Sequence, residues 1–162
     1  MNAPIVSLHP LRDETETRLC AAFLVTSEPW ITLGLTFEQG LERLSDPTRE
    51  VHVAVVRDQI VGVVILFLNG TFKGYIQTIA VHPDWRSRGV GQQVMAFAER
   101  RIFSLSPNVF LCVSSFNLRA QKFYERLGYQ RVGEMTDFVV RGHSEILMRK
   151  TRGPLRDFKP CE

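Results

Sequence analysis

Apolar and polar residues recur along the chain with two different periods, and each change of period predicts where a helix or a strand begins. A short strand is expected at residues 5–8. Asp13 followed by Glu16 is typical of a helix N-terminus, and Thr36 followed by Gln39 repeats the pattern. Apolar residues at helical spacing follow each pair, and a proline closes each segment. This part of the chain therefore predicts one strand and two helices.

The pattern changes to that of strands after residue 50. Two runs rich in β-branched residues, 51–56 and 60–68, are separated by a short polar turn. Asn69-Gly70 is typical of a type I′ hairpin turn, and a further strand is expected over about 72–81. Three antiparallel strands in a meander are therefore predicted.

Helical spacing returns after Gly89. The apolar face of this helix consists of Val90, Val94, Phe97, Ala98, Ile102 and Leu105. A buried strand is expected over 109–113. Because a helix connects this strand to the one before it, the two strands should be parallel and joined by a right-handed crossover.

One more helix and two more strands complete the predicted order. Asn117 is a candidate N-cap, and Gly128 suits the C-terminus of the helix that follows it. The final strands are expected near 129–135 and 138–148, with a turn at Arg141-Gly142. The order β-α-α-β-β-β-α-β-α-β-β predicts the α/β class, a mixed sheet covered by helices.

The bulk properties fit one compact globular domain. The chain has 162 residues, of which 44% are hydrophobic, and we expect residues 1–150 to form the domain and 151–162 a weakly ordered tail. Three scattered cysteines favour a reducing compartment over a disulfide framework or a metal site. No leader pattern is recognised, and the longest apolar run is too short to cross a bilayer, so a cytoplasmic protein without membrane attachment is expected.

The charge is only mildly basic, with a net charge of +3 and a pI near 9.0. Nucleic-acid-binding domains usually gather more positive charge in one patch, so such a partner is not expected. Arginines at positions 86, 88, 100 and 101 form one local cluster. They are either a solvated helix face or an attraction for an anionic cofactor, and charge alone does not decide.

The segment 79–91 carries the clearest chemical signal. A strand ends there and a helix begins at Gly89 and Gly91, close to Arg86 and Arg88. The first N–H groups of a helix have no partner within it, and the helix dipole adds partial positive charge. Glycines let an anion approach the backbone. The pattern predicts a phosphate site, although a plain turn with two glycines is the alternative, and it matches neither a P-loop nor a dinucleotide fingerprint.

Two motifs resemble those of the GCN5-related N-acetyltransferase (GNAT) family. Arg86-Ser87-Arg88-Gly89-Val90-Gly91 is similar to the family's R/Q-x-x-G-x-G/A pyrophosphate loop, and the preceding Ile79-Ala80-Val81-His82-Pro83 resembles its fourth strand and exit. The segment 117–129 is similar to its second motif, N-x-x-A-x-x-F-Y-x-x-x-G-F/Y. The resemblance runs from about residue 51 to 135 and implies a GNAT-like acyl-CoA N-acyltransferase fold, with acetyl-CoA as co-substrate and no metal.

The resemblance also implies roles for individual residues. The strand Ile79-Ala80-Val81 would pair with the pantetheine arm, Asn117 would bond its end, and Tyr124 would protonate the leaving thiolate. The pyrophosphate would be held by Arg86, Ser87, Arg88, Gly89, Val90, Gly91 and Gln92. Asn117 as a simple N-cap and Tyr124 as a core aromatic are the alternatives. Helical geometry predicts that Phe123 faces the core while Tyr124 reaches the edge of the cleft.

The acceptor and the base are less defined. The resemblance implies an acceptor site near Glu28 and Trp30, between the two N-terminal helices, and near His143, although interhelical packing explains Trp30 equally well. The family often places a carboxylate on its fourth strand, whereas residues 75–78 have none. Candidates for the base are Glu28, His52, His143 and Glu145.

The function implied is transfer of acetyl from acetyl-CoA to a primary amine by direct attack in a ternary complex. The amine can belong to a small molecule or to a protein, and a homodimer is compatible with the family. A catalytically inactive acyl-CoA sensor is the alternative, with a nucleic-acid-binding module as a third class. The sequence leaves the acceptor, the base and the role of the tail open.

Overall fold

The computed structural model describes residues 3–160 and contains a seven-stranded mixed sheet with four α-helices. Neighbouring strands follow the order β1-β2-β3-β4-β5-β7-β6. The chain divides into two compact units. The first consists of the chain up to Phe67 and of Gln77–Arg100, and the second consists of Leu68–Ile76 and the chain from Arg101 onward. The α/β class and the predicted element order are confirmed.

The first unit holds three complete strands and most of a fourth. β1 (Ser7–Pro10), β2 (Glu50–Val56) and β3 (Gln59–Phe67) pair antiparallel, with Ser7 opposite Val55 and Glu50 opposite Leu66. The turn between β2 and β3 has two residues with positive φ, Arg57 and Asp58, as a type I′ turn requires. The predicted strands at 51–56 and 60–68 are therefore confirmed.

Helices cover both faces of this part of the sheet. α1 (Glu14–Val25) and α2 (Phe37–Ser45) pack against Val51 and Val53 of β2, together with Val63 and Ile65 of β3, in one apolar core. Side chains alternate between faces along a strand, so His52 points the other way and contacts Phe97 of α3 (Val90–Phe103).

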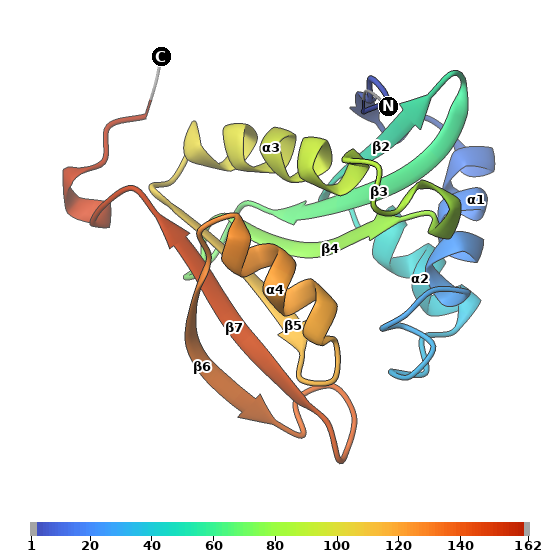
Figure 1. Ribbon diagram of the computed structural model, residues 1–162. Coiled ribbons are helices and arrows are strands. Elements are labelled where there is room, and N and C mark those ends of the chain that lie inside the picture. The colour runs from blue at the N-terminus through green and yellow to red at the C-terminus, as the bar shows by residue number, and fades with distance from the viewer. Residues whose placement is uncertain (1–2, 161–162) are drawn as a thin grey trace. The chain divides into compact units, whose positions relative to one another are not determined.

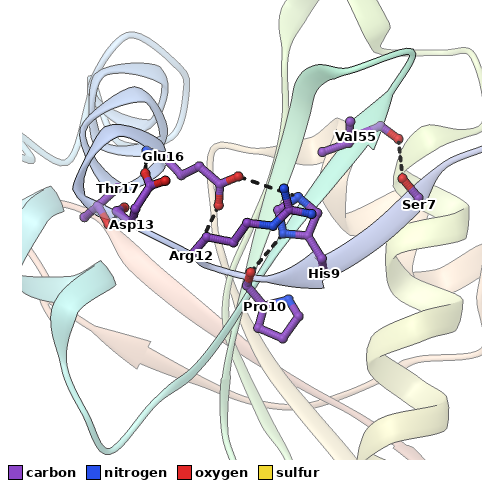
Figure 2. A network of polar contacts seen from close by, with 8 residues as sticks. All are labelled: Ser7, His9, Pro10, Arg12, Asp13, Glu16, Thr17 and Val55. Carbon is purple, nitrogen blue, oxygen red and sulfur yellow. Dashed lines mark hydrogen bonds and ion pairs between the residues drawn. The ribbon is translucent and has the colours of Figure 1, made fainter.

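The predicted helix caps are present. Thr36 and Gln39 form a reciprocal capping box at α2. At α1, the Asp13 carboxylate accepts from the N–H of Glu16 at 2.9 Å. The Glu16 carboxylate reaches back to accept from the N–H of Arg12 (Figure 2). Its other oxygen is 3.7 Å from Nε2 of His9 in β1. The same few residues thus start α1 and tie it to the first strand.

The second unit contains the C-terminal strands. β5 (Asn108–Ser114) pairs parallel with the start of β4 (Tyr75–Val81), as predicted. β7 (Ser144–Thr151) pairs antiparallel with β5 on one side and with β6 (Gln130–Thr136) on the other. α4 (Leu118–Arg126) connects β5 to β6 and lies beside β5 and β7 (Figure 1). Gln121 fixes it there by donating to the carbonyls of Ser114 and Ser115.

One predicted turn and one predicted strand boundary are wrong. Asn69-Gly70 forms no two-residue hairpin, because β3 ends at Phe67, β4 begins only at Tyr75, and Gly70 but not Asn69 has positive φ. The last strand begins at Ser144 rather than residue 138, because Asp137 adopts a φ of 53° and its carboxylate accepts from the N–H of Gly142, which closes a loop. Local residue type favoured a turn at both places but did not fix its length.

Candidate functional site

The segment between β4 and α3 has the geometry of an anion site. Ser87 and Gly89 adopt positive φ values of 61° and 81°. The Gly89 carbonyl accepts the hydrogen bond of Gln93 N–H at 3.2 Å, so the helix starts directly after it. The N–H groups of Val90, Gly91 and Gln92 belong to the first turn, where no helical acceptor exists. With the partial positive charge of the helix N-terminus, these groups form the kind of site that binds phosphate.

The two arginines of this segment have different environments. Arg86 donates through Nε to the Val81 carbonyl at 2.9 Å, which holds the segment against the end of β4. Arg88 is exposed and lies over the Trp85 ring at 5.6 Å. Arg86 thus has a structural task in addition to its charge, while Arg88 presents its charge at the surface.

His82 and Trp85 serve the turn itself. His82 caps the short 3-10 helix Pro83–Trp85 by accepting from Asp84 N–H, and its ring stacks on Phe23. Its backbone N–H donates to the Val61 carbonyl at 2.8 Å. These contacts give His82 a structural role at the end of β4.

The second unit contains Asn117 at the N-terminus of α4. Its Oδ1 accepts from the N–H of Ala120 at 3.2 Å, so Asn117 is an N-cap. In the described part of the chain, no hydrogen bond engages its Nδ2. The side chain can therefore cap the helix with its oxygen and still donate to a ligand with its nitrogen.

Tyr124 is buried, contrary to the geometric prediction. It is 8% exposed, whereas Phe123, expected in the core, is only half-buried. The Tyr124 ring packs between the rings of Phe123 and Tyr129, with centroids 5.4 and 5.9 Å away. The prediction failed because Tyr124, not Phe123, lies on the buried face of α4. Burial also raises the pKa of the phenol, which keeps it protonated.

A buried polar pair joins β5 and β7 in the same unit. The Ser114 hydroxyl donates to the Glu145 carboxylate at 2.6 Å, and both residues are at most 6% exposed. Burial raises the pKa of Glu145, and the shift is opposed by Ser114 and by the charge of nearby His143. The imidazole of His143 packs edge-on against Phe116 with centroids 5.0 Å apart.

The other acceptor and base candidates lie in the first unit. Glu28 is exposed and accepts from Thr32 N–H at 3.2 Å. Trp30 is buried in the core that α1 and α2 share, which is the packing that was its alternative explanation. His52 bonds Glu50 at 2.9 Å and is 8% exposed.

Sequence reasoning missed two arginines that contact β4. Arg43 of α2 donates to the hydroxyl of Thr78 at 3.3 Å, and Arg49, between α2 and β2, donates to the side-chain oxygen of Gln77 at 2.8 Å. Gln77 and Thr78 directly precede Ile79. Each arginine is about thirty residues from its partner, so no local pattern announced the contacts.

Residues 3–160 contain neither a membrane-spanning helix nor a cluster of metal ligands. No helix there is both long and apolar enough to span a membrane. No group of three or more histidine, cysteine, aspartate or glutamate side chains is arranged to hold a metal ion in that part of the chain.

Known proteins resemble the chain in sequence. Residues 12–129 match the model of the acetyltransferase (GNAT) family. Acetyltransferase ECA0875 of Pectobacterium atrosepticum is 30% identical over 109 residues, which cover 67% of this chain and 74% of that protein. N-acetylaspartate synthetase of Danio rerio is 31% identical over 110 residues, 64% of this chain, and the match spans only 35% of the zebrafish protein.

Solved structures share the fold. An aminoglycoside 6′-N-acetyltransferase complexed with coenzyme A has a TM-score of 0.73 at 18% identity, covering 93% of this chain and 98% of that one. A GNAT acetyltransferase of Elizabethkingia anophelis with acetyl-CoA bound has a TM-score of 0.71 at 15% identity, covering 90% and 97%.

Proposed function

The chain belongs to the GNAT acetyltransferase family, and from that premise we propose that it transfers acetyl from acetyl-CoA to a primary amine. The coenzyme A and acetyl-CoA held by proteins of the same fold support the choice of co-substrate. The zebrafish relative is named for an N-acetylated amino acid, which is what acetylation of a primary amine yields.

The cofactor is proposed to bind along the end of β4 and the start of α3. Backbone groups of Ile79 and Val81 pair with the pantetheine arm, which runs alongside the strand past Ala80. The N–H groups from Arg86 to Gln92 receive the pyrophosphate, with charge supplied by Arg88. In the second unit, Asn117 donates to the pantetheine end through the Nδ2 that its N-cap role leaves available.

The reaction is a direct attack in a ternary complex. The neutral amine nitrogen bonds to the thioester carbonyl carbon, the tetrahedral intermediate collapses, and the carbon–sulfur bond breaks. The amine loses its proton to a base or to water, and the thiolate takes a proton from the phenol of Tyr124. Burial raises the pKa of Tyr124, so its phenol carries a proton at neutral pH, as that of an ordinary tyrosine does.

The acceptor is proposed to contact the segment that contains Glu28 and Trp30 and the loop that contains His143. Exposure of Glu28 supports this placement, and so does the position of His143 beside the Ser114–Glu145 pair. Since the burial of Trp30 fits packing, its part would be to shape the segment rather than to bond the acceptor.

The positive φ of Gly89 at the start of α3 is the observation that carries this proposal. Gly89→Glu places bulk and negative charge where the pyrophosphate is expected. Calorimetry should show acetyl-CoA affinity severely weakened in the folded variant.

The matched control is Gly142→Glu. Gly142 has a φ of 87°, close to the 81° of Gly89, and a Cβ there meets nothing within 4 Å. The control therefore adds the same charge at a similar φ but outside residues 86–92, and acetyl-CoA affinity is compared without an acceptor amine present. If both variants bind acetyl-CoA as the unchanged chain does, the cofactor binds elsewhere.

A further inference from the structure

The side-chain amide of Gln93, near the start of α3, binds a segment from the beginning of the described chain. Its Nε2 donates to the Pro4 carbonyl at 2.8 Å, and its Oε1 accepts from the Val6 N–H at 3.1 Å. The amide therefore pairs with the two backbone groups on either side of Ile5, as a neighbouring strand would. The partners are 89 and 87 residues apart in the sequence, so no local pattern predicts the contact.

The same segment also touches the residue at which α3 starts. A Cβ at Gly89 would come 3.2 Å from the Cβ of Ala3, so the backbone of Gly89 lies close against this side chain. Gly89 and Gln93 are the two residues whose hydrogen bond closes the first turn of the helix. Residues 3–6 contact both of them and continue directly into β1, which pairs with β2. The first turn of α3 is therefore joined to the sheet within the first unit.

The segment proposed to receive the pyrophosphate is thereby held at both ends. At its start, Arg86 Nε donates to the Val81 carbonyl of β4 at 2.9 Å. At its other end, Gln93 directly follows Gln92 and binds the backbone of residues 4 and 6. A segment held at both ends has less conformational freedom to lose when a ligand orders it, so binding costs less entropy. Cofactor affinity should therefore depend on Gln93 although its side chain contacts the protein rather than the ligand.

We propose that Gln93 is a positioning residue for acetyl-CoA: its amide binds residues 4 and 6 and keeps residues 86–92 in the conformation that receives the pyrophosphate. The inference rests on the proposed function and adds an anchor for its cofactor site. The anchor acts on cofactor binding and not on the chemical step, because the pantetheine arm separates the pyrophosphate from the thioester that reacts.

The first test replaces Gln93 with leucine, which keeps much of the side-chain volume and removes both hydrogen bonds. Calorimetry without an amine present should show acetyl-CoA affinity lowered by about three- to tenfold, the effect of losing one or two neutral hydrogen bonds. With an amine that the chain acetylates, kcat at saturating acetyl-CoA should stay the same. Partial unfolding would instead lower kcat and the binding stoichiometry and leave the affinity unchanged.

The second test removes the same contact from its other side. Val6→Pro eliminates the N–H that Gln93 Oε1 accepts from, and it keeps the backbone carbonyls. It should also weaken acetyl-CoA binding, and it keeps the test open if Gln93→Leu does not fold. Added to Gln93→Leu, it should weaken binding no further, because the bond is already absent. Additive losses would mean that the two residues act separately, which contradicts the proposal.

The matched control is Gln39→Leu at the start of α2. Gln39 is exposed and accepts from the Thr36 N–H at 3.0 Å, so the same substitution removes a hydrogen bond between a side-chain amide and the backbone in the same unit. It should leave acetyl-CoA affinity unchanged. An equal loss of affinity in this control would mean that the effect of Gln93→Leu is not specific to the start of α3.

The outcomes separate the inference from the function beneath it. If Gln93→Leu binds acetyl-CoA as the unchanged chain does while Gly89→Glu does not, the cofactor site stands and the positioning role of Gln93 is wrong. Tighter binding by Gln93→Leu also contradicts the proposal and would mean that residues 3–6 obstruct the site. If the unchanged chain does not bind acetyl-CoA, the proposed function itself fails.

Discussion

At the scale of the residue, the burial of Tyr124 determines the protonation state of its phenol. Its ring packs against Phe123 of α4 and against Tyr129, the residue before β6, and burial raises the pKa of the phenol above the ordinary value near 10 for tyrosine. It therefore remains a proton donor throughout the pH range in which enzymes work.

Tyr124→Phe removes only this donor and keeps the ring. We expect kcat to fall by about 10²–10⁴-fold, the usual cost of losing a general acid, with acetyl-CoA affinity unchanged. Tyr129→Phe makes the same chemical change in a neighbouring buried ring and should leave kcat nearly intact. Near-normal kcat for Tyr124→Phe, with chemistry limiting the rate, would assign Tyr124 to packing alone.

The buried carboxyl of Glu145 makes the stability of the fold depend on pH. Burial raises the pKa of this carboxyl in the folded state. At pH values between the unfolded pKa, near 4.3, and the higher folded pKa, the folded protein therefore binds more protons than the unfolded chain. Its contribution to stability is fully present below about pH 4.3 and is lost as pH rises through the folded pKa. Glu145→Gln removes this loss of stability at higher pH, and its side-chain oxygen can still accept the hydrogen bond of the Ser114 hydroxyl.

Thermal unfolding from pH 4 to pH 7 measures the effect. The melting temperature of Glu145→Gln minus that of the unchanged chain should increase with pH. Glu125→Gln, on the exposed side of α4, should give a difference that stays flat. A constant or falling difference for Glu145→Gln would show that this carboxyl is not destabilised by burial.

At the scale of the element, glycines fix where strands meet. Gly74, just before β4, has a φ of 93°, and a Cβ there would come within 2.5 Å of the Asn108 carbonyl and of Ile102. Gly142, between β6 and β7, has nearly the same φ of 87° with nothing within 4 Å. The pair separates backbone strain from crowding.

Gly142→Ala should therefore cost roughly 1–2 kcal/mol of unfolding free energy, the penalty of a left-handed conformation for a residue with a Cβ. Gly74→Ala carries the same penalty plus about 1–3 kcal/mol or more for displacing packed atoms. Urea unfolding of both variants measures the difference. Equal losses would mean that the backbone before β4 moves aside without cost.

Elements that depend on side chains close together in the sequence could be predicted, and those that depend on contacts between distant residues could not. The capping box of α2 and the two-residue turn between β2 and β3 follow from side chains a few positions apart. The long loop after β3 and the late start of β7 depend on where partner strands end. Insertion of β7 between β5 and β6 likewise depends on pairing across the chain, which no short motif encodes.

At the scale of the whole molecule, some residues of the candidate site could be predicted from local motifs and others only from the structure. The start of α3 and the N-cap at Asn117 are local motifs, so the sequence located both. Arg43 and Arg49 became candidates only once folding brought them to β4, and the orientation of Tyr124 depended on which face α4 turns to the sheet. Contacts between residues far apart in the sequence are therefore the part of the candidate site that required the structure.

Acetyl transfer from acetyl-CoA to an amine by this chain can be measured in one experiment. The most direct measurement incubates the protein with acetyl-CoA and a mixture of amino acids, peptides and polyamines, quantifying free coenzyme A thiol and, by mass spectrometry, every acetylated product. We expect that one class of amine gains an acetyl group in equal amount to the thiol released, and that Gly89→Glu abolishes both. Saturable acetyl-CoA binding without any acetylated amine would contradict it and identify a cofactor-binding module without catalysis.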